Sequence, residues 1–239
     1  MEMRNENRLS ATADPGCDSC ATRQQCLFAR AASANNNSIK LHLRERAVGV
    51  GELIEKQGDL ANFIGVVKVG LLKGLRSNAQ NISKPIALFG RGRVVGLSSA
   101  YRLPSRLTLV AVTPMRLCEV GSETFERHTL MQGGLQELLL RSAASKVDCL
   151  TDWARLLREE SHLQRLCNAL RLIAVEEGSQ AFRIPSHSDL ADLLGSRRET
   201  IARNLSTLIR RGFFRKTGRW HGVLTRPQCE VQGIESETD

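Results

Sequence analysis

The spacing of hydrophobic positions changes along the chain, and each spacing predicts a different element. Between Leu43 and Val120, short apolar runs rich in β-branched residues are interrupted by Gly and Asp, which predicts antiparallel strands. A small roll or barrel is the simplest closure of such strands. Residues Leu135–Leu157 contain no Pro or Gly and repeat apolar residues at helical spacing, so a long helix is expected there. A further apolar helical segment covers Leu163–Val175.

The long helix carries two stripes of residues. The apolar stripe consists of Leu139, Ala143, Val147, Leu150, Ala154 and Leu157. The second stripe alternates steps of four and three, as a coiled-coil seam does, and is made of Leu138, Ser142, Ser145, Cys149, Asp152 and Leu156. Its small and polar residues predict a weak dimer seam. Facing Asp152 carboxylates near a two-fold axis would repel each other and favour the monomer, although a solvated carboxylate is an equal alternative.

A helix-turn-helix pattern follows the second helical segment. Ser186 with Asp189, and Ser196 with Glu199, both fit the capping-box pattern, and Gly195 lies between the two pairs. The apolar positions expected to be buried are Leu190, Ala191, Leu194, Ile201, Leu205, Leu208 and Ile209. Two helices that meet at a tight turn and bury such faces are typical of a DNA-binding motif.

The second of these helices is expected to enter the major groove. Arginine can donate two hydrogen bonds to guanine, and a carboxylate can accept one from cytosine. The predicted DNA-reading residues are Ser196, Arg197, Arg198, Glu199, Thr200 and Arg203. Beyond this helix, residues 213–226 are expected to form a wing-like hairpin that turns at Gly218 and offers cationic side chains to phosphates. A plain solvated face is the alternative for these arginines.

Charge and composition support a nucleic-acid partner. The chain of 239 residues has 34 Lys and Arg against 25 Asp and Glu, a formal net charge of +9. No apolar run is long enough to span a bilayer and no export signal opens the chain, so we expect a cytoplasmic protein without a membrane partner. Seven cysteines in such a protein favour metal or redox chemistry over a disulfide framework.

Four of the cysteines form a candidate metal site. Cys17, Cys20 and Cys26 have the spacing C-x2-C-x5-C in a short arm, which a low-complexity linker, Ala31–Ser38, separates from the strands. Cys118 lies in an expected strand, out of phase with Met115 and Leu117, so it should point away from their face. Four thiolates satisfy either a [4Fe–4S] cluster or a tetrahedral zinc, and the spacing alone does not choose between them.

Over nearly its full length the sequence resembles the CRP/FNR superfamily of transcriptional regulators. The most specific part is SRRETIAR, in which Arg198, Glu199 and Arg203 match the base-reading residues of regulators that bind TGTGA-like half-sites. The arm and the Cys118-Glu119-Val120 segment resemble the oxygen-sensing FNR branch, which implies a [4Fe–4S] cluster. Arg198 and Ala202 depart from FNR towards CRP, and Gln25 stands where FNR proteins have a shielding leucine.

The resemblance implies an α+β fold: an N-terminal β-roll of the cyclic-nucleotide-binding type, a long dimerisation helix and a C-terminal winged helix-turn-helix. The expected segments are a cysteine arm (1–30), the β-roll sensor (31–128), the dimerisation helix (129–160), the DNA-binding domain (161–228) and an acidic tail (229–239). It also implies a homodimer that binds a palindrome of double-stranded DNA and meets RNA polymerase.

Several alternatives remain open at this point. A cyclic-nucleotide pocket could use Arg106, but Leu97 follows Gly96 where cAMP-binding members have a glutamate, so this pocket reads as vestigial. A zinc or thiol-redox arm would serve a regulator equally well. Five histidines, His42, His128, His162, His187 and His221, form no pair at haem-ligand spacing. An iron–sulfur or thiol redox enzyme lacks a catalytic constellation, and a ligand-free architectural DNA-binding protein is the last alternative. Cys149, Cys167 and Cys229 are expected in the core, seam or tail.

Overall fold

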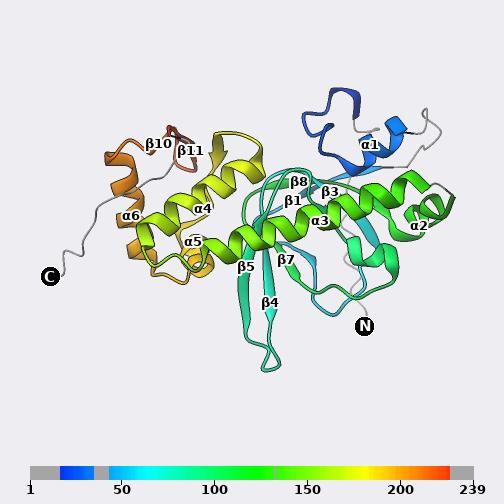
Figure 1. The fold of residues 1–239 in the computed structure, drawn as a ribbon, viewed down its shortest axis with the longest axis horizontal. Helices are drawn as coiled ribbons and strands as arrows, with labels where there is room; N and C mark the ends of the chain where they lie inside the picture. Colours follow the sequence, from blue (N-terminus) through cyan, green and yellow to red (C-terminus); the bar gives the residue numbers. More distant parts are fainter. Residues whose placement is uncertain (1–16, 35–42, 132, 227–239) are drawn as a thin grey trace, which may run out of the picture.

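A computed structural model of the chain describes residues 17–34, 43–131 and 133–226. The strands gather into a roll in the middle of the molecule, and one long helix runs along it towards a smaller C-terminal module (Figure 1). Within the described residues no helix is both long and apolar enough to cross a membrane. The acidic tail, His42 and Cys229 lie outside the described residues.

The roll consists of two four-stranded antiparallel sheets, as the alternation of apolar runs predicted. One sheet has the strand order β1-β8-β3-β6 and the other β2-β7-β4-β5. The strands are β1 Arg44–Val48, β2 Leu53–Glu55, β3 Phe63–Val69, β4 Leu72–Ser77, β5 Ser83–Phe89, β6 Val94–Val95, β7 Thr108–Ala111 and β8 Met115–Gly121. The prediction of a β-roll between Leu43 and Val120 is therefore confirmed.

The β1-β8-β3-β6 sheet separates two hydrophobic cores. Met115 and Leu117 of β8 face the interior of the roll, and Cys118 and Val120 of the same strand face the opposite core. This opposite core is covered by helix α1 (Leu27–Ala34), which lies over the sheet in Figure 1. The strand alternation thus places Cys118 on the face predicted for it.

Helix α1 runs past the arm boundary expected at residue 30. Ala31 is buried inside it, so the first four residues of the predicted linker Ala31–Ser38 are helical. The composition of Ala, Ser and Asn indicated a linker, but Leu27, Phe28 and Ala31 share one helical face that packs on the roll.

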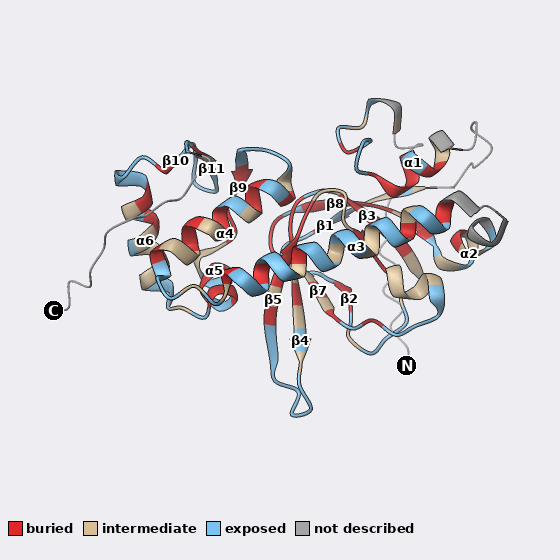
Figure 2. Cartoon of the chain, viewed as in Figure 1, coloured by how far each residue is buried: buried red, intermediate tan, exposed pale blue. Residues whose placement is uncertain are grey.

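The long helix α3 spans Gly133–Leu156 and follows a shorter helix α2, Ser122–Met131, which the sequence analysis did not expect. Trp153 is fully buried where α3 packs against the roll and helix α4. Red buried positions recur along only one side of α3 in Figure 2.

The burial of α3 corrects the predicted dimer seam. Leu156 is fully buried and Cys149 is 5% exposed, with its thiol donating to the Leu88 carbonyl at 3.5 Å. These two side chains pack within their own subunit and cannot form a seam with a second copy. Of the other four, Ser145 and Asp152 are exposed, and Leu138 and Ser142 are half-buried. Val147, in the stripe expected to be apolar and packed, is 58% exposed.

The C-terminal module is a winged helix-turn-helix, as predicted. It contains α4 His162–Glu177, β9 Ala181–Arg183, α5 His187–Leu194, α6 Arg198–Arg210, β10 Phe214–Lys216 and β11 His221–Leu224. Its three strands form one sheet in the order β10-β11-β9. The hairpin between β10 and β11 turns at residues 217–220, which include the predicted Gly218.

Candidate cysteine centre and DNA-reading surface

The cysteine arm is built from consecutive tight turns. Cys17 opens a turn of 3-10 helix, the Cys20 amide donates to the Cys17 carbonyl at 3.4 Å, and the Cys26 amide donates to the Arg23 carbonyl at 3.3 Å. Two contacts fix the arm to the roll. The buried Thr22 hydroxyl donates to the Lys68 carbonyl on β3 at 2.9 Å, and the Phe28 ring meets the Phe125 ring edge-on at 6.3 Å.

These turns bring all four predicted cysteines to one pocket. Cys17, Cys20 and Cys26 line it from the arm and Cys118 lines it from β8. The other side chains around it are Arg23, Ala29, Leu43 and Lys68. Its volume is about 10 Å³, which is room for about one water molecule.

The four cysteines are the ligand types expected for a metal site, but their sulfurs are not close enough together to bind one metal ion. In the described ranges no three Cys, His, Asp or Glu side chains are grouped closely enough to hold a metal ion. Four thiolates are the complete ligand set of a [4Fe–4S] cluster or a tetrahedral zinc. The residues therefore fit such a group, and binding it requires the arm to shift relative to β8.

The pocket is electrically asymmetric. Burial raises the pKa of the Cys118 thiol to about 12, and the nearby Lys68 ammonium acts in the opposite sense. Burial also raises the pKa of Cys26. Lys68 is paired with Glu45 at 2.7 Å, so a cation stands next to the place where thiolate charge would collect. Sequence reasoning missed Lys68 because nothing in the β3 pattern marks it.

The raised pKa of Cys118 predicts a loss of stability at alkaline pH in metal-free protein. An unfolded cysteine releases its proton near pH 9.0, whereas the folded thiol keeps its proton to about 12. The contribution of the protonated Cys118 thiol to the free energy of unfolding is fully present below pH 9. It falls as the pH rises from 9 towards 12, because in that range only the unfolded chain releases the proton. Between about pH 8 and pH 10.5, wild type should lose about 2 kcal/mol more unfolding free energy than Cys118→Ser. Urea denaturation measures this difference, and equal losses would contradict it.

Gln25 does not shield the cysteine pocket. It is exposed on the other side of the arm and lines a separate cleft of about 320 Å³ together with Arg91, Arg93, Ser145 and Glu176. Its side chain therefore lies outside the cysteine pocket and meets the roll at the turn that contains Gly92.

The alternative pocket based on Arg106 keeps little of a binding site. Arg106 is exposed, and its backbone carbonyl accepts a hydrogen bond from the Arg76 guanidinium. Gly96, with φ of 69°, donates its amide to the buried Glu55 carboxylate at 3.1 Å. The position after it is Leu97, which cannot accept a hydroxyl hydrogen bond.

The helix-turn-helix has one of its two predicted caps. The Ser186 hydroxyl accepts from the Asp189 amide at 3.0 Å, so Ser186 is the N-cap of α5, and the same hydroxyl, in place of the backbone amide of a capping box, donates to the Asp189 carboxylate at 2.6 Å. Helix α6 begins instead after Arg197, which has an extended backbone and makes no side-chain cap. The cap expected at Ser196 is therefore wrong.

The burial of these helices largely follows the predicted pattern. Helix α5 buries Leu190, Ala191 and Leu194 as expected, together with Leu193. Helix α6 buries Ile201, Leu205 and Leu208, whereas Ile209, also expected to be buried, is 37% exposed.

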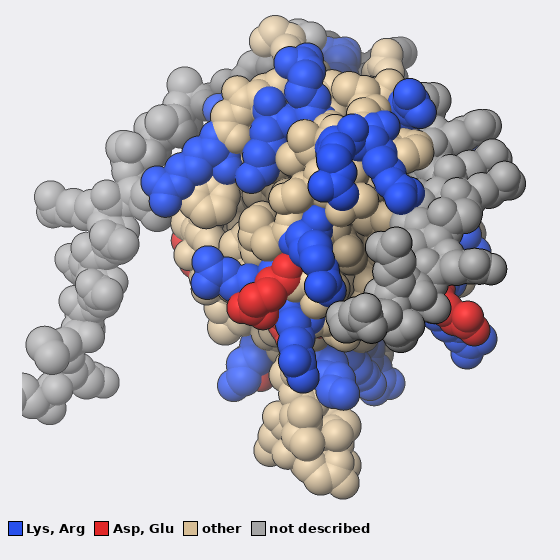
Figure 3. Space-filling model, turned by 90° about the vertical axis from the view of Figure 1, so that its left-hand side faces the viewer, with Lys and Arg blue, Asp and Glu red and all other residues tan. Residues whose placement is uncertain are grey.

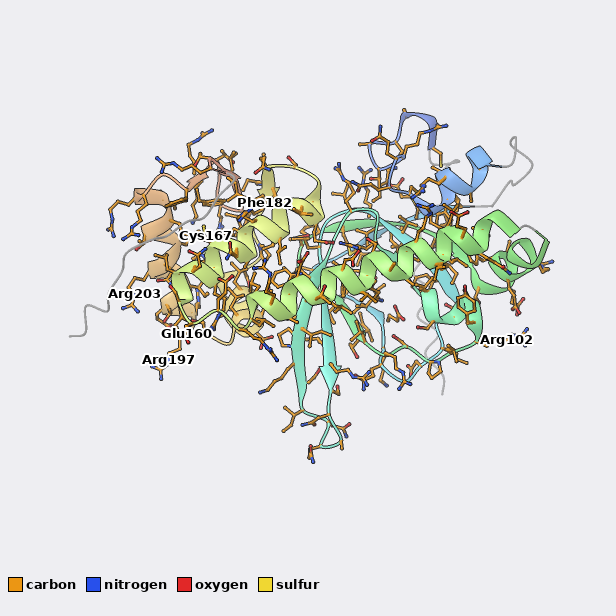
Figure 4. The ribbon with its side chains drawn as sticks, in the orientation of Figure 1. Arg102, Glu160, Cys167, Phe182, Arg197 and Arg203 are labelled. Carbon is orange, nitrogen blue, oxygen red and sulfur yellow. The ribbon has the colours of Figure 1, made fainter. Side chains whose placement is uncertain are left out.

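Most of the predicted base-reading side chains are exposed on α6 or just before it, and Ser196 instead lines a pocket at the turn between α5 and α6. Arg197, Arg198, Glu199 and Arg203 are exposed, and Ser196 and Thr200 are half-buried. Figure 4 shows Arg197 and Arg203 pointing away from the body of the molecule at the end farthest from the arm. The pKa of His187 is lowered chiefly by burial, and the neighbouring cations Lys216 and Arg198 lower it further.

This end of the molecule is strongly cationic. Viewed end-on, Lys and Arg side chains cover much of the surface and few acidic groups interrupt them (Figure 3). The wing adds the exposed residues Arg215, Lys216, Arg219 and Arg226. Such a surface beside a recognition helix suits the phosphate backbone of DNA.

Comparisons with known proteins agree with this reading. Residues 45–129 match the cyclic nucleotide-binding domain family, and residues 164–228 match the Crp-like helix-turn-helix domain family. The chain belongs to the CRP/FNR family of transcriptional regulators. It is therefore a DNA-binding transcriptional regulator, as the sequence indicated.

Two curated relatives of this CRP/FNR regulator are similar over most of their length. It is 24% identical over 226 residues to the transcriptional activator protein FnrL of Cereibacter sphaeroides, covering 87% of this chain and 88% of that one. A probable transcriptional activator of Rhizobium leguminosarum bv. viciae is 24% identical over 212 residues, 83% and 85% of the two chains. The structure of FixK2 from Bradyrhizobium japonicum shares the fold, with a TM-score of 0.67 and 22% identity over 78% of this chain and 94% of that one.

Proposed function

We propose that this regulator acts in the cytoplasm as a homodimer whose DNA affinity depends on a [4Fe–4S] cluster and so responds to oxygen. The observation that carries the proposal is the meeting of Cys17, Cys20 and Cys26 of the arm with Cys118 of β8 at one pocket. Nothing else in the described chain gathers four soft ligands. A cluster held there would supply the reactivity with oxygen.

The chain's own residues would hold the cluster by closing the arm on the roll. Phe28 and Thr22 anchor the arm at two points on either side of the ligand Cys26. Lys68 offers a positive charge beside the sulfurs, which favours their thiolate forms, while its partner Glu45 acts in the opposite sense.

The outer face of α3 supports pairing of two chains. Leu140 and Val147 are 69% and 58% exposed, and with Ala144, Thr151 and Ala154 they form a stripe in alternating steps of four and three. This stripe replaces the seam predicted through Cys149 and Leu156. Asp152 lies beside it and lines a surface pocket with Arg155 and Arg171, two cations that weaken the repulsion proposed for it.

A dimer of this kind would present two copies of α6. Their separation suits half-sites of about one helical turn, roughly 10 bp, on a palindrome. Arg198, Glu199 and Arg203 would read TGTGA-like half-sites, and the wing would contact phosphates. Contacts to RNA polymerase are expected of an activator, but no surface is assigned to them.

The test is purification without oxygen followed by spectroscopy and operator binding. We expect a broad visible absorbance, iron and sulfide near four of each per chain, and tight binding to a TGTGA-type palindrome that air abolishes together with the absorbance. Colourless protein without iron that binds operator equally in air would overturn the proposal.

Zinc is the second candidate, and the size of the pocket favours it. A volume of about 10 Å³ accepts a single ion with less movement of the arm than a four-iron cluster needs. One zinc per chain, with air-indifferent operator binding, would identify a structural arm. Cyclic AMP added to the binding assay checks the remaining ligand, and we expect no effect because Leu97 replaces the required carboxylate.

A further inference from the structure

One turn of the roll touches the cysteine arm on one side and the DNA-binding module on the other. The turn is Gly90-Arg91-Gly92-Arg93, between β5 and β6. Gly92, with φ of 78°, packs so closely on the arm that an added Cβ would lie 2.8 Å from the Cβ of Gln25. Gln25 directly precedes Cys26, so a shift of Cys26 would move Gln25 against Gly92.

The opposite side of the turn holds Glu176, near the end of α4. This carboxylate is buried, at 5% exposure, and accepts the Gly90 amide at 2.7 Å and the Arg93 Nε at 2.9 Å. The Arg91 amide donates to the Glu176 carbonyl at 2.7 Å. A Cβ on Gly90 would lie 2.4 Å from that carbonyl oxygen, so the backbones meet only because residue 90 is glycine.

Arg93 extends the same junction to the long helix. Its guanidinium donates to the Ser145 hydroxyl and carbonyl of α3, each at 2.7 Å, while it pairs with Glu176. The arm, the turn, α3 and α4 also share the cleft of about 320 Å³, so this junction has open space in which its parts can shift.

A shift of α4 reaches the recognition helix directly. Leu166, Leu170 and Ile173 of α4 belong to one core with Ile201 and Leu205 of α6, and the two helices are in contact. Close-packed helices move together because their side chains interdigitate. Glu176 therefore lies between the element that carries three sulfur ligands and the helix that reads DNA.

We propose that Glu176 is the positioning residue through which the cysteine arm sets the placement of α6. The proposal rests on the proposed function, in which the arm is the sensor. When the arm moves, the Gly90–Arg93 turn moves with it and carries Glu176 and α4. The roll and the DNA-binding module share a second ionic contact, between Lys73 of β4 and Asp189 of α5 at 2.9 Å. Lys73 touches no described arm residue, so this contact does not transmit a movement of the arm.

Linkage gives a test that needs no cluster, because if the arm conformation alters the affinity for DNA, bound DNA must in turn shift the population of arm conformations, which the alkylation of an arm cysteine reports. In reduced, metal-free, full-length protein, saturating operator DNA should change the rate at which iodoacetamide alkylates Cys20, followed residue by residue with mass spectrometry. Cys20 is half-buried in the arm, and Figure 1 shows the arm at the opposite end of the molecule from α6, so DNA bound to α6 does not cover it directly. We expect a change of about fivefold or more in wild type.

Glu176→Gln keeps the shape and an acceptor for Gly90 but removes the charge that holds Arg93. It should reduce the DNA-induced change to less than about 1.5-fold, while Lys73→Gln, the matched control, should keep it. The double variant Arg93→Gln/Glu176→Gln avoids an unpaired buried charge and serves if the single variant does not fold. An unchanged rate in wild type, or a full change in folded Glu176→Gln with DNA bound, overturns the proposal. Absence of iron would refute the cluster and leave this result standing.

Discussion

Cys118→Ser protein, purified without oxygen, should contain less than about a tenth of the wild-type iron and sulfide and should show no broad visible absorbance. Cys118 is the only one of the four proposed ligands that the roll provides, since the other three lie on the arm. Without it a cluster held by the arm would lose a quarter of its thiolates and its only ligand on the sheet. Operator binding should then be weak and the same in air as under nitrogen.

Cys149→Ser is the matched control for this experiment. Cys149 is also buried, and burial raises its pKa to about 12 as well, but it lies on α3 and donates to the Leu88 carbonyl. Serine can keep that hydrogen bond. The variant should retain iron, colour and the response to air. Equal loss of iron in both variants would mean that Cys118 acts through stability and not as a ligand.

The sequence predicted which face of its strand Cys118 occupies, because that depends on one local rule, whereas the contact of the distant arm with this face does not follow from the strand pattern. Side chains alternate across a strand, so the opposite phases of Cys118 and Leu117 placed the thiol on the outer face of the sheet without any knowledge of the fold. The winged helix-turn-helix was equally accessible, since its helices are short and each buries a face of its own. Both predictions needed only neighbours in the sequence.

The dimer seam could not be predicted in the same way. A helix presents several stripes, and the one that its own subunit covers is chosen by distant partners, here the roll and α4. Leu156 and Cys149 are buried by those partners, so the exposed stripe through Leu140 and Val147 is left for a second chain. The helical segment expected from the sequence ends at Val175 and leaves Glu176 out, because the contacts of Glu176 with Gly90 and Arg93 lie more than 80 residues away in the sequence.

The Ser196 cap failed for a related reason. The sequence SRRE has the letters of a capping box, yet α6 begins one residue later, after Arg197. Because Gly195 closes α5 in a left-handed conformation with φ of 59°, the turn fixes where the next helix can begin. The geometry of the turn at Gly195, and not the capping-box letters, therefore sets the start of α6. The base-reading residues were nevertheless identified, since a shift of one residue leaves the exposed face of α6 unchanged.

Replacing Arg198 and Arg203 together with alanine should cost roughly 2 to 6 kcal/mol of operator binding, about 1 to 3 kcal/mol for each arginine if they act independently. Both side chains are exposed on α6, and neither forms a salt bridge among the described residues, so they are available for base edges. Each can donate two hydrogen bonds to one guanine. Binding should be measured by fluorescence anisotropy on the palindrome and on single-base variants at fixed salt.

The change in base specificity, more than the loss of affinity, distinguishes a base contact from a phosphate contact for Arg198 and Arg203. In a single variant, the penalty for changing the guanine that the missing arginine reads should shrink, while penalties at other base pairs stay the same. Arg210→Ala is the control, because Arg210 is exposed in the last turn of the same helix, away from the end expected to meet base edges. If removal of the Arg210 side chain has an effect, it should weaken binding to all DNA sequences alike and lower the salt dependence of the binding constant by about one charge. Uniform weakening by Arg198→Ala or Arg203→Ala would assign that residue to the phosphate backbone, because a phosphate contact cannot distinguish one base pair from another.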